Sequence, residues 1–107
     1  MKNIYELGYW LKIESQTNED LERIKKVLSS NNAEIIFEES PKKRNLAYPI
    51  NKQRIGYFGY IIFKIEQKEN LAIINQELLK IANILRFIII KRKAFIPKEQ
   101  PIAHESK

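Results

Sequence analysis

The side chains of this chain that could do chemistry are its lysines and arginines, and most of them lie in two blocks. Residues 41–64 carry six bases and no acid, and residues 84–107 carry six bases and two acids. Lysine and arginine neutralise phosphate groups, so these blocks indicate an anionic partner such as nucleic acid. Charged runs are usually only solvated surface, so the blocks indicate a binding site only if the fold brings them together.

The residue types that catalysis needs are poorly represented. His104 is the only histidine and lies near the end of the chain, and there is no cysteine to act as a nucleophile or metal ligand. The neighbouring acids at 19–20 and 38–39 fit the surfaces of elements better than an acid–base pair, and no Walker-type loop or nucleophile elbow is present. We expect no catalytic residue, no metal site, no cofactor and no small-molecule substrate, and therefore no enzyme.

The length of 107 residues fits one domain and one hydrophobic core. No run reaches the roughly 18 apolar residues that a membrane-spanning helix needs, and acidic and basic residues interrupt any signal-peptide core near the N-terminus. The absence of cysteine excludes a disulfide framework. We therefore expect a cytoplasmic protein with no membrane partner.

The first part of the chain predicts a strand and then a helix. Aromatic and branched residues alternate with other types over Ile4–Glu14, which is typical of a strand with one buried face. Thr17 and Asp20 have the spacing of a capping box, and apolar residues then recur at helical spacing as far as Leu28. Asparagines at 31–32 fit a left-handed turn at the end of the helix.

The next part predicts two strands joined by a polar turn. The apolar run in Ala33–Glu39 begins a strand, which Pro41 and a basic cluster interrupt before it resumes at Leu46–Ile50. Proline cannot donate a hydrogen bond to a strand ladder, so this break predicts an edge strand or a bulged ribbon. After a turn over residues 51–56, Tyr57–Ile65 has the aromatic and branched composition of a third strand.

The last part predicts a second helix, a fourth strand and a tail. Asn70 fits a helix N-cap, and apolar residues recur at helical spacing as far as Ala82. Leu85–Arg92 alternates like a strand, whereas the sequence after it loses all periodicity. We expect residues 1–96 to form the domain and residues 97–107 to form a flexible tail.

The order β-α-β-β-α-β predicts a ferredoxin-like α+β fold, a four-stranded antiparallel sheet with two helices on one face. Strands one and three are then central and strands two and four lie at the edges. Several large apolar side chains fall on the sheet side away from the helices, namely Trp10, Phe58, Tyr60, Ile62, Ile88 and Ile90. These are too many for a solvated surface, so we interpret this side as a contact surface.

One run of the sequence resembles the RNA recognition motif. Residues from Arg54 to Phe63 are similar to its third-strand signature, although an extra residue separates Gly56 from Gly59. The resemblance implies a free single-stranded RNA-binding protein that stacks bases on residues 57–58, which we keep as an alternative. A small enzyme of the acylphosphatase type is a third class, but it requires a phosphate-binding loop that is not visible after the first strand.

A more specific resemblance lies just before that run. Residues Lys43–Lys52, KRNLAYPINK, closely resemble the central hairpin of the sixth protein of the bacterial small ribosomal subunit, the S-six family. That family shows a basic pair before Leu-Ala-Tyr-Pro-Ile, a lysine two residues on and then Gly-Tyr, which stands at residues 56–57. The resemblance extends to residues 5–6 and 85–86 and so covers about residues 2–95. The chain departs from the family in having fewer basic residues after the initiator methionine and one arginine instead of two at the start of the last strand.

Members of the S-six family bind the central domain of small-subunit ribosomal RNA together with ribosomal protein S-eighteen, as a heterodimer that docks during subunit assembly. The resemblance therefore implies a structural constituent of the small ribosomal subunit that acts in translation. We expect contacts with ribosomal RNA at five cations, Lys2, Arg86, Lys91, Arg92 and Lys93. We expect contacts with the partner or with RNA at a second set, Lys42, Lys43, Arg44, Lys52, Arg54, Trp10, Phe58 and Tyr60.

Overall fold

The computed structural model describes residues 3–50 and 52–92, without the side chains of Ala47 and Tyr48. The elements follow the order β1 (Asn3–Lys12), α1 (Thr17–Ser30), β2 (Glu34–Ile50), β3 (Gln53–Ile65), α2 (Glu69–Leu79) and β4 (Ile84–Arg92). The predicted order of strands and helices is therefore confirmed. The predicted tail and domain boundary lie outside the described residues, as do Lys2, Lys93 and His104.

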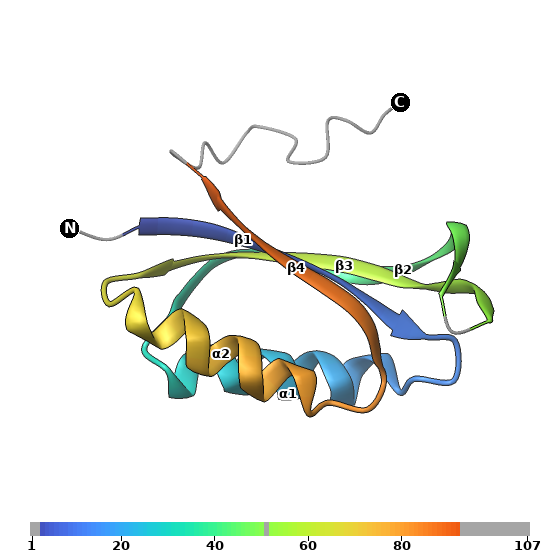
Figure 1. Ribbon diagram of the computed structural model, residues 1–107, viewed down its shortest axis with the longest axis horizontal. Coiled ribbons are helices and arrows are strands. Elements are labelled where there is room, and N and C mark those ends of the chain that lie inside the picture. Colours follow the sequence, from blue (N-terminus) through green and yellow to red (C-terminus); the bar gives the residue numbers. More distant parts are fainter. Residues whose placement is uncertain (1–2, 51, 93–107) are drawn as a thin grey trace.

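The four strands form one antiparallel sheet in the order β2-β3-β1-β4. Both helices lie on the same side of this sheet (Figure 1). This confirms the ferredoxin-like arrangement, with β1 and β3 central and β2 and β4 at the edges. Neither of the two described helices is long and apolar enough to cross a membrane.

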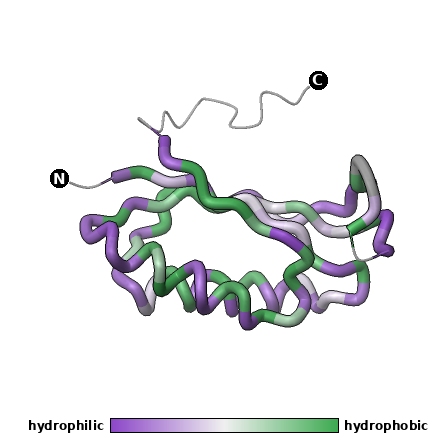
Figure 2. The backbone as a smooth tube through the Cα atoms, in the orientation of Figure 1, coloured by the Kyte–Doolittle hydropathy of each residue, from purple (hydrophilic) through white to green (hydrophobic). Residues whose placement is uncertain are grey.

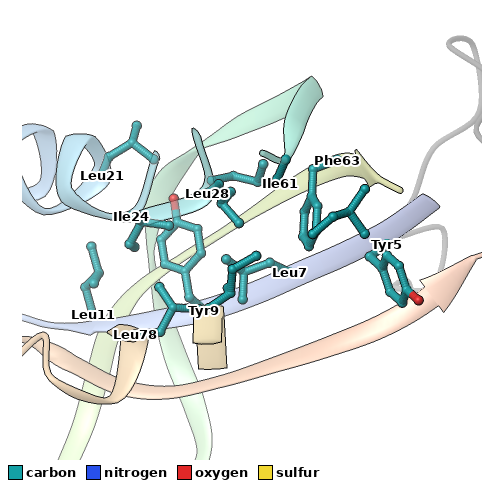
Figure 3. Packing of buried hydrophobic residues seen from close by; sticks show 13 residues of the cluster. Tyr5, Leu7, Tyr9, Leu11, Leu21, Ile24, Leu28, Ile61, Phe63 and Leu78 are labelled. Carbon is teal, nitrogen blue, oxygen red and sulfur yellow. The ribbon is translucent and has the colours of Figure 1, made fainter. Parts of the chain in front are cut away.

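The core fills the space between the helices and the sheet, because alternate residues of the central strands point toward the helices. In β1 the buried side chains are those at the odd positions from Tyr5 to Leu11. They pack with apolar side chains of β3 and both helices, including Ile61, Phe63, Ile24, Leu28, Ile74 and Leu78 (Figure 3). Fully burying each such side chain contributes roughly 1.5–3 kcal/mol. The even positions of β1 therefore point to the opposite side, which we call the open face.

The start of α1 differs from the predicted capping box. The N-cap is Gln16, which makes no side-chain cap, and Asp20 is buried instead of capping the helix. Its carboxylate accepts hydrogen bonds from Ser15 Oγ at 2.6 Å, from Asn83 Nδ2 at 2.8 Å and from the Arg23 guanidinium. Donors from outside the helix thus turn this carboxylate inward, because a buried charge needs such partners.

The predicted N-cap of the second helix is also wrong. The N-cap of α2 is Lys68, while the Asn70 side chain donates to the Asn31 carbonyl oxygen at 3.0 Å and so ties α2 to the end of α1. The helix ends at Leu79, before Ala82, which is exposed. The apolar periodicity continued past the helix because half-buried Ile81 still packs against the core.

The prediction of a bulged edge strand is confirmed in β2. This strand is continuous, but its register with β3 shifts in three places, one of them spanning Pro41 between Glu39 and Lys42. The turn before β3 is shorter than predicted, because β3 begins at Gln53. Among residues 3–50 and 52–92, two residues have left-handed backbones, the predicted Asn32 with φ of 65° and also Lys52 with φ of 66°.

The β2–β3 hairpin extends past the end of the central strand. β1 ends at Lys12, which lies opposite Gly56. The hairpin residues between the turn and Gly56 therefore have no neighbour in β1. Figure 1 shows this end of the hairpin beside the loop that leads from β1 into α1. The basic residues of β2 are thereby placed at one end of the sheet.

Candidate nucleic-acid interface

One row of side chains crosses the whole open face at this end of the sheet. Trp10 pairs with Phe58 on one side and with Arg86 on the other, and Phe58 pairs in turn with Lys42. The strand register therefore aligns four residues, one from each strand. Arg86 and Lys42 come from the two basic blocks of the sequence, so the fold does bring these blocks together.

The two aromatic side chains in the middle of the row are in contact. The Trp10 and Phe58 ring centroids lie 5.0 Å apart and the rings are inclined at 50°. Both side chains are half-buried, so part of each ring remains open to solvent. The pair forms an apolar platform between two exposed cations.

More cations lie next to this platform. Lys12 pairs with Gly56, and Gly56 pairs with Arg44, which gives a second row on the same face. Arg54 lies two residues before Gly56 on β3 and so shares that face. We call this region the aromatic–basic end of the open face, defined by Trp10, Lys12, Lys42, Arg44, Arg54, Phe58 and Arg86.

Little negative charge neutralises the aromatic–basic end. Lys42 Nζ lies 3.1 Å from a Glu39 carboxylate oxygen, with 61% of the lysine side chain exposed. Within residues 3–50 and 52–92, no ion pair engages Lys12, Arg44, Arg54 or Arg86. These cations are therefore available to an anionic ligand.

The middle of the open face is apolar and uneven. Ile88 and Ile90 on β4 are 59% and 51% exposed. Tyr60 and Ile62 on β3 are buried, and the Tyr60 ring stacks with Phe37 at a centroid distance of 5.8 Å. Burial, with the nearby Glu39 and Glu6 carboxylates, raises the pKa of the Tyr60 hydroxyl. Tyr60 thus offers a partner little surface, unlike the half-buried Trp10 and Phe58.

The far end of the open face holds an internal ion pair. Arg92 Nη1 lies 2.8 Å from Glu6 Oε1, and the two side chains are only 17% and 20% exposed. Lys91 is exposed but pairs with Tyr5, whose side chain faces the helices, so it lies on the opposite side of the sheet from Arg86. The cations predicted on β4 are therefore not brought together on one surface.

The remaining predicted residues lie on the hairpin. Lys43 pairs with Tyr57 on the helix side of the sheet, and Lys52 occupies the turn; both are exposed. Tyr57 packs against the core, so of the two aromatics at 57–58 only Phe58 faces the open side. The side-by-side stacking that the RNA-recognition-motif alternative implies is not available in this fold.

The sequence identifies Arg86 and Lys42 as basic residues but gives no reason to join them with Lys12. Lys12 lies two residues after Trp10 on an alternating strand, so the parity of β1 was a signal that both share a face. The alternation of side chains along a strand does not reveal which residue of the neighbouring strand lies opposite, so the pairing of Arg86 with Trp10 could not be predicted. Among the described residues, no group of three or more acidic or histidine side chains could hold a metal ion.

The fold and this face define a class, a single ferredoxin-like α+β domain with a basic and partly aromatic sheet surface. The model of the family described as Ribosomal protein S6 matches residues 4–91. The chain is 30% identical over 91 residues to small ribosomal subunit protein bS6 of Fusobacterium nucleatum subsp. nucleatum, covering 82% of this chain and 96% of that protein. It is 29% identical to the bS6 protein of Sulfurovum sp., covering 98% of this chain and 88% of that one.

A solved structure shares the same fold. The crystal structure of 30S ribosomal protein S6 from Thermotoga maritima superposes with a TM-score of 0.79 at 24% identity, covering 86% of this chain and 89% of that one. The chain belongs to the ribosomal protein S6 family, as the family match over most of its length shows. The resemblance of its hairpin sequence to the S-six family is confirmed.

Proposed function

We propose that this chain is a non-enzymatic constituent of the small ribosomal subunit in the cytoplasm, where it binds the central domain of small-subunit ribosomal RNA together with ribosomal protein S-eighteen. The observation that carries the proposal is the family match over residues 4–91. The bS6 relatives are small ribosomal subunit proteins by name. The clustered cations of the open face support RNA as the ligand.

The cations differ in how well they suit a phosphate ligand. Arg86 is exposed on the open face and shares its row with Lys42, so it is the strongest candidate among the β4 cations. Arg92 already pairs with Glu6, and a phosphate would have to compete with that carboxylate. Lys91 is exposed on the other side of the sheet, where it would meet a different part of the RNA.

The exposed isoleucines support the protein partner. Ile88 and Ile90 place two large apolar side chains next to each other on the open face, halfway along the edge strand β4. Covering such a patch is favourable because it removes apolar surface from water. We assign this middle part of the open face to S-eighteen.

Binding of a central-domain RNA fragment tests the proposal, measured with the full chain alone and with S-eighteen. We expect weak binding alone and tighter binding with the partner. Ile90→Lys should remove the strengthening by S-eighteen and leave binding of the chain alone unchanged or stronger. Arg86→Gln should weaken binding in both cases.

Two results would count against the proposal. Ribosomes purified from the source that lack this chain, while it is abundant in the free cytosolic fraction, would overturn it. RNA binding that S-eighteen does not strengthen would favour the alternative, a free single-stranded RNA-binding protein. Hydrolysis of acyl phosphates by the purified chain would favour the acylphosphatase class instead.

A further inference from the structure

We propose that the aromatic–basic end of the open face binds an unpaired RNA nucleotide, whose base stacks on the Trp10–Phe58 pair while the flanking phosphates meet the surrounding cations. The inference rests on the proposed RNA-binding function and deepens it. It adds a base contact at a defined place to a function that phosphate contacts alone would satisfy. It also divides the open face between two ligands, RNA at one end and protein in the middle.

The two rings of the platform are inclined at 50°, so a base can stack on one ring and touch the edge of the other. The two rings are in contact at 5.0 Å and both retain exposed surface. Gly8, two residues before Trp10 on β1, has no side chain to cover the rings, and a Cβ there would lie 3.7 Å from the Phe58 ring and 3.8 Å from Ile88 Cγ2. A base can therefore reach the exposed parts of the two rings from the solvent side of the open face.

The charge around the platform fits a polyanion. Arg86 and Lys42 flank it in the same row, and Lys12 lies two residues away on the Trp10 strand. Neighbouring strands are about 4.8 Å apart, so the row from β4 to β2 spans roughly 14 Å. A nucleotide on the two central strands thus has cations on both sides, within reach of the phosphates before and after it.

A protein partner fits this end less well than RNA does. The cores of protein interfaces are apolar and poor in lysine, whereas this end carries two lysines on one face. Its three arginines are common in protein interfaces but bind phosphate equally well. Only Lys42 among these cations has an acidic partner within the described residues. The exposed isoleucines in the middle of the face match the chemistry of a protein interface better. Charge complementarity therefore commits the aromatic–basic end to RNA.

The sequence provides a direct probe for this proposal, because Trp10 is the only tryptophan. A base stacked on Trp10 quenches its fluorescence. The experiment titrates the full chain with a uridine hexamer, and in parallel with an abasic hexamer that has the same phosphates and no bases. We expect quenching by the uridine hexamer only, and affinity about 5- to 150-fold weaker for the abasic strand.

A pair of variants locates the contact. Phe58→Leu removes one ring of the platform and should weaken binding of the uridine hexamer about 5-fold or more, while changing the affinity for the abasic hexamer little. Phe37→Leu is the matched control, because Phe37 is a half-buried phenylalanine at the far part of the same face, opposite Ile62. It should leave both affinities unchanged. Thermal unfolding of both variants checks that they are folded.

The outcomes separate this inference from the proposed function. Equal affinity for both hexamers without quenching would overturn the stacking site, even if the central-domain fragment still binds. A change in Trp10 emission on adding S-eighteen that also blocks the uridine hexamer would overturn it too, because a protein would then occupy this end. No binding of the central-domain fragment, with or without S-eighteen, would instead refute the proposed function.

Discussion

Two glycines on neighbouring strands differ in the space around them. A Cβ at Gly56 would lie 2.8 Å from the Leu11 carbonyl oxygen, which is backbone and cannot move aside. A Cβ at Gly8 would make only ordinary contacts, at 3.7 Å or more. We expect Gly56→Ala to lower the free energy of unfolding by about 1–3 kcal/mol. Gly8→Ala should raise it by about 0.5–1 kcal/mol, since alanine loses less entropy in a strand.

Urea denaturation of both variants measures this difference. A large loss of stability in Gly8→Ala would contradict the space that the structure gives the open face at that position. An unchanged midpoint in Gly56→Ala would show that β1 and β3 can separate locally at the start of the hairpin.

A second residue, Tyr9, carries a buried hydroxyl that is not hydrogen-bonded. Its ring stands toward the α1 side chains Ile24 and Leu28 (Figure 3), and the hydroxyl oxygen has no hydrogen-bond partner among the described residues. A buried polar group without a partner costs about 1–3 kcal/mol. We therefore expect Tyr9→Phe to leave the free energy of unfolding at pH 7 unchanged or to raise it by up to that amount.

The same hydroxyl affects stability at high pH. Burial, with the negative charge of Glu38, raises the pKa of Tyr9 in the folded state. The folded state therefore holds this proton more tightly than the unfolded state does, so stability is full below about pH 10 and falls as the pH rises further. Tyr9→Phe should flatten this alkaline loss in denaturation measured from pH 8 to 11. A variant that unfolds more easily at pH 7 would show that the hydroxyl has a bonding partner after all.

At the scale of elements, the buried Asp20 side chain links two loops that are far apart in the sequence. Its carboxylate accepts from Ser15 in the loop after β1 and from Asn83 in the loop before β4, and it pairs with Arg23 on α1. Burial raises the pKa of this carboxyl, but the three donors outweigh it and the pKa is lowered. We expect Asp20→Asn to lower the free energy of unfolding by about 1.5–3 kcal/mol, because an amide nitrogen faces these donors without accepting from them.

The sign of the pH effect follows from the lowered pKa. Stability from Asp20 is present above its unfolded pKa of about 3.9 and is lost as the pH falls through the folded value. Chemical denaturation from pH 2 to 7 should therefore show a shallower acid limb in Asp20→Asn. Glu19→Gln is the matched control, since it removes one charge from an exposed neighbour and should change neither the limb nor the stability much. A wild-type acid limb in Asp20→Asn would refute this linkage.

The elements themselves were largely predictable from alternation. The period of two at Tyr5 to Leu11 indicated the buried face of β1, and Pro41 marked β2 as a bulged edge strand. The helix caps were not predictable, because Asp20 and Asn70 are bound by groups far away in sequence, Asn83 and Asn31. The spacing of residues along a helix predicts only hydrogen bonds between a side chain and the nearby backbone. A hydrogen-bonding group from a distant part of the chain can replace such a bond, as it does at Asp20 and Asn70.

At the scale of the whole molecule, the fold converts two basic blocks into one charged surface. Alternation showed that Trp10 and Phe58 share a face, but it could not show that Arg86 lies beside Trp10. That alignment depends on the register between β1 and β4, which shifts directly after Trp10. β4 is hydrophobic over most of its length with hydrophilic stretches near its ends (Figure 2), and the register decides which of these ends meets the hairpin. The location of the site was therefore unpredictable although its residue types were not.

The net charge of +6 is a poor guide to RNA affinity if location decides it, and this can be tested at constant charge. One triple variant replaces Lys12, Arg44 and Arg54 with glutamine at the aromatic–basic end. The control variant replaces Lys26, Lys68 and Lys80 with glutamine, and these three lysines are exposed on or beside the helices. Both lose three charges, so any difference between them reports position alone.

Affinity for the central-domain RNA fragment is then measured from 50 to 200 mM salt. Each phosphate that the protein no longer neutralises should reduce the slope of log affinity against log salt by about 0.7–0.9. We expect the slope of the first variant to fall by about two units and the control to keep the wild-type slope, since its cations lie on the far side of the sheet. Equal slopes in the two variants would mean that RNA affinity depends on the total charge of the protein. The aromatic–basic end would then not be the RNA-binding surface.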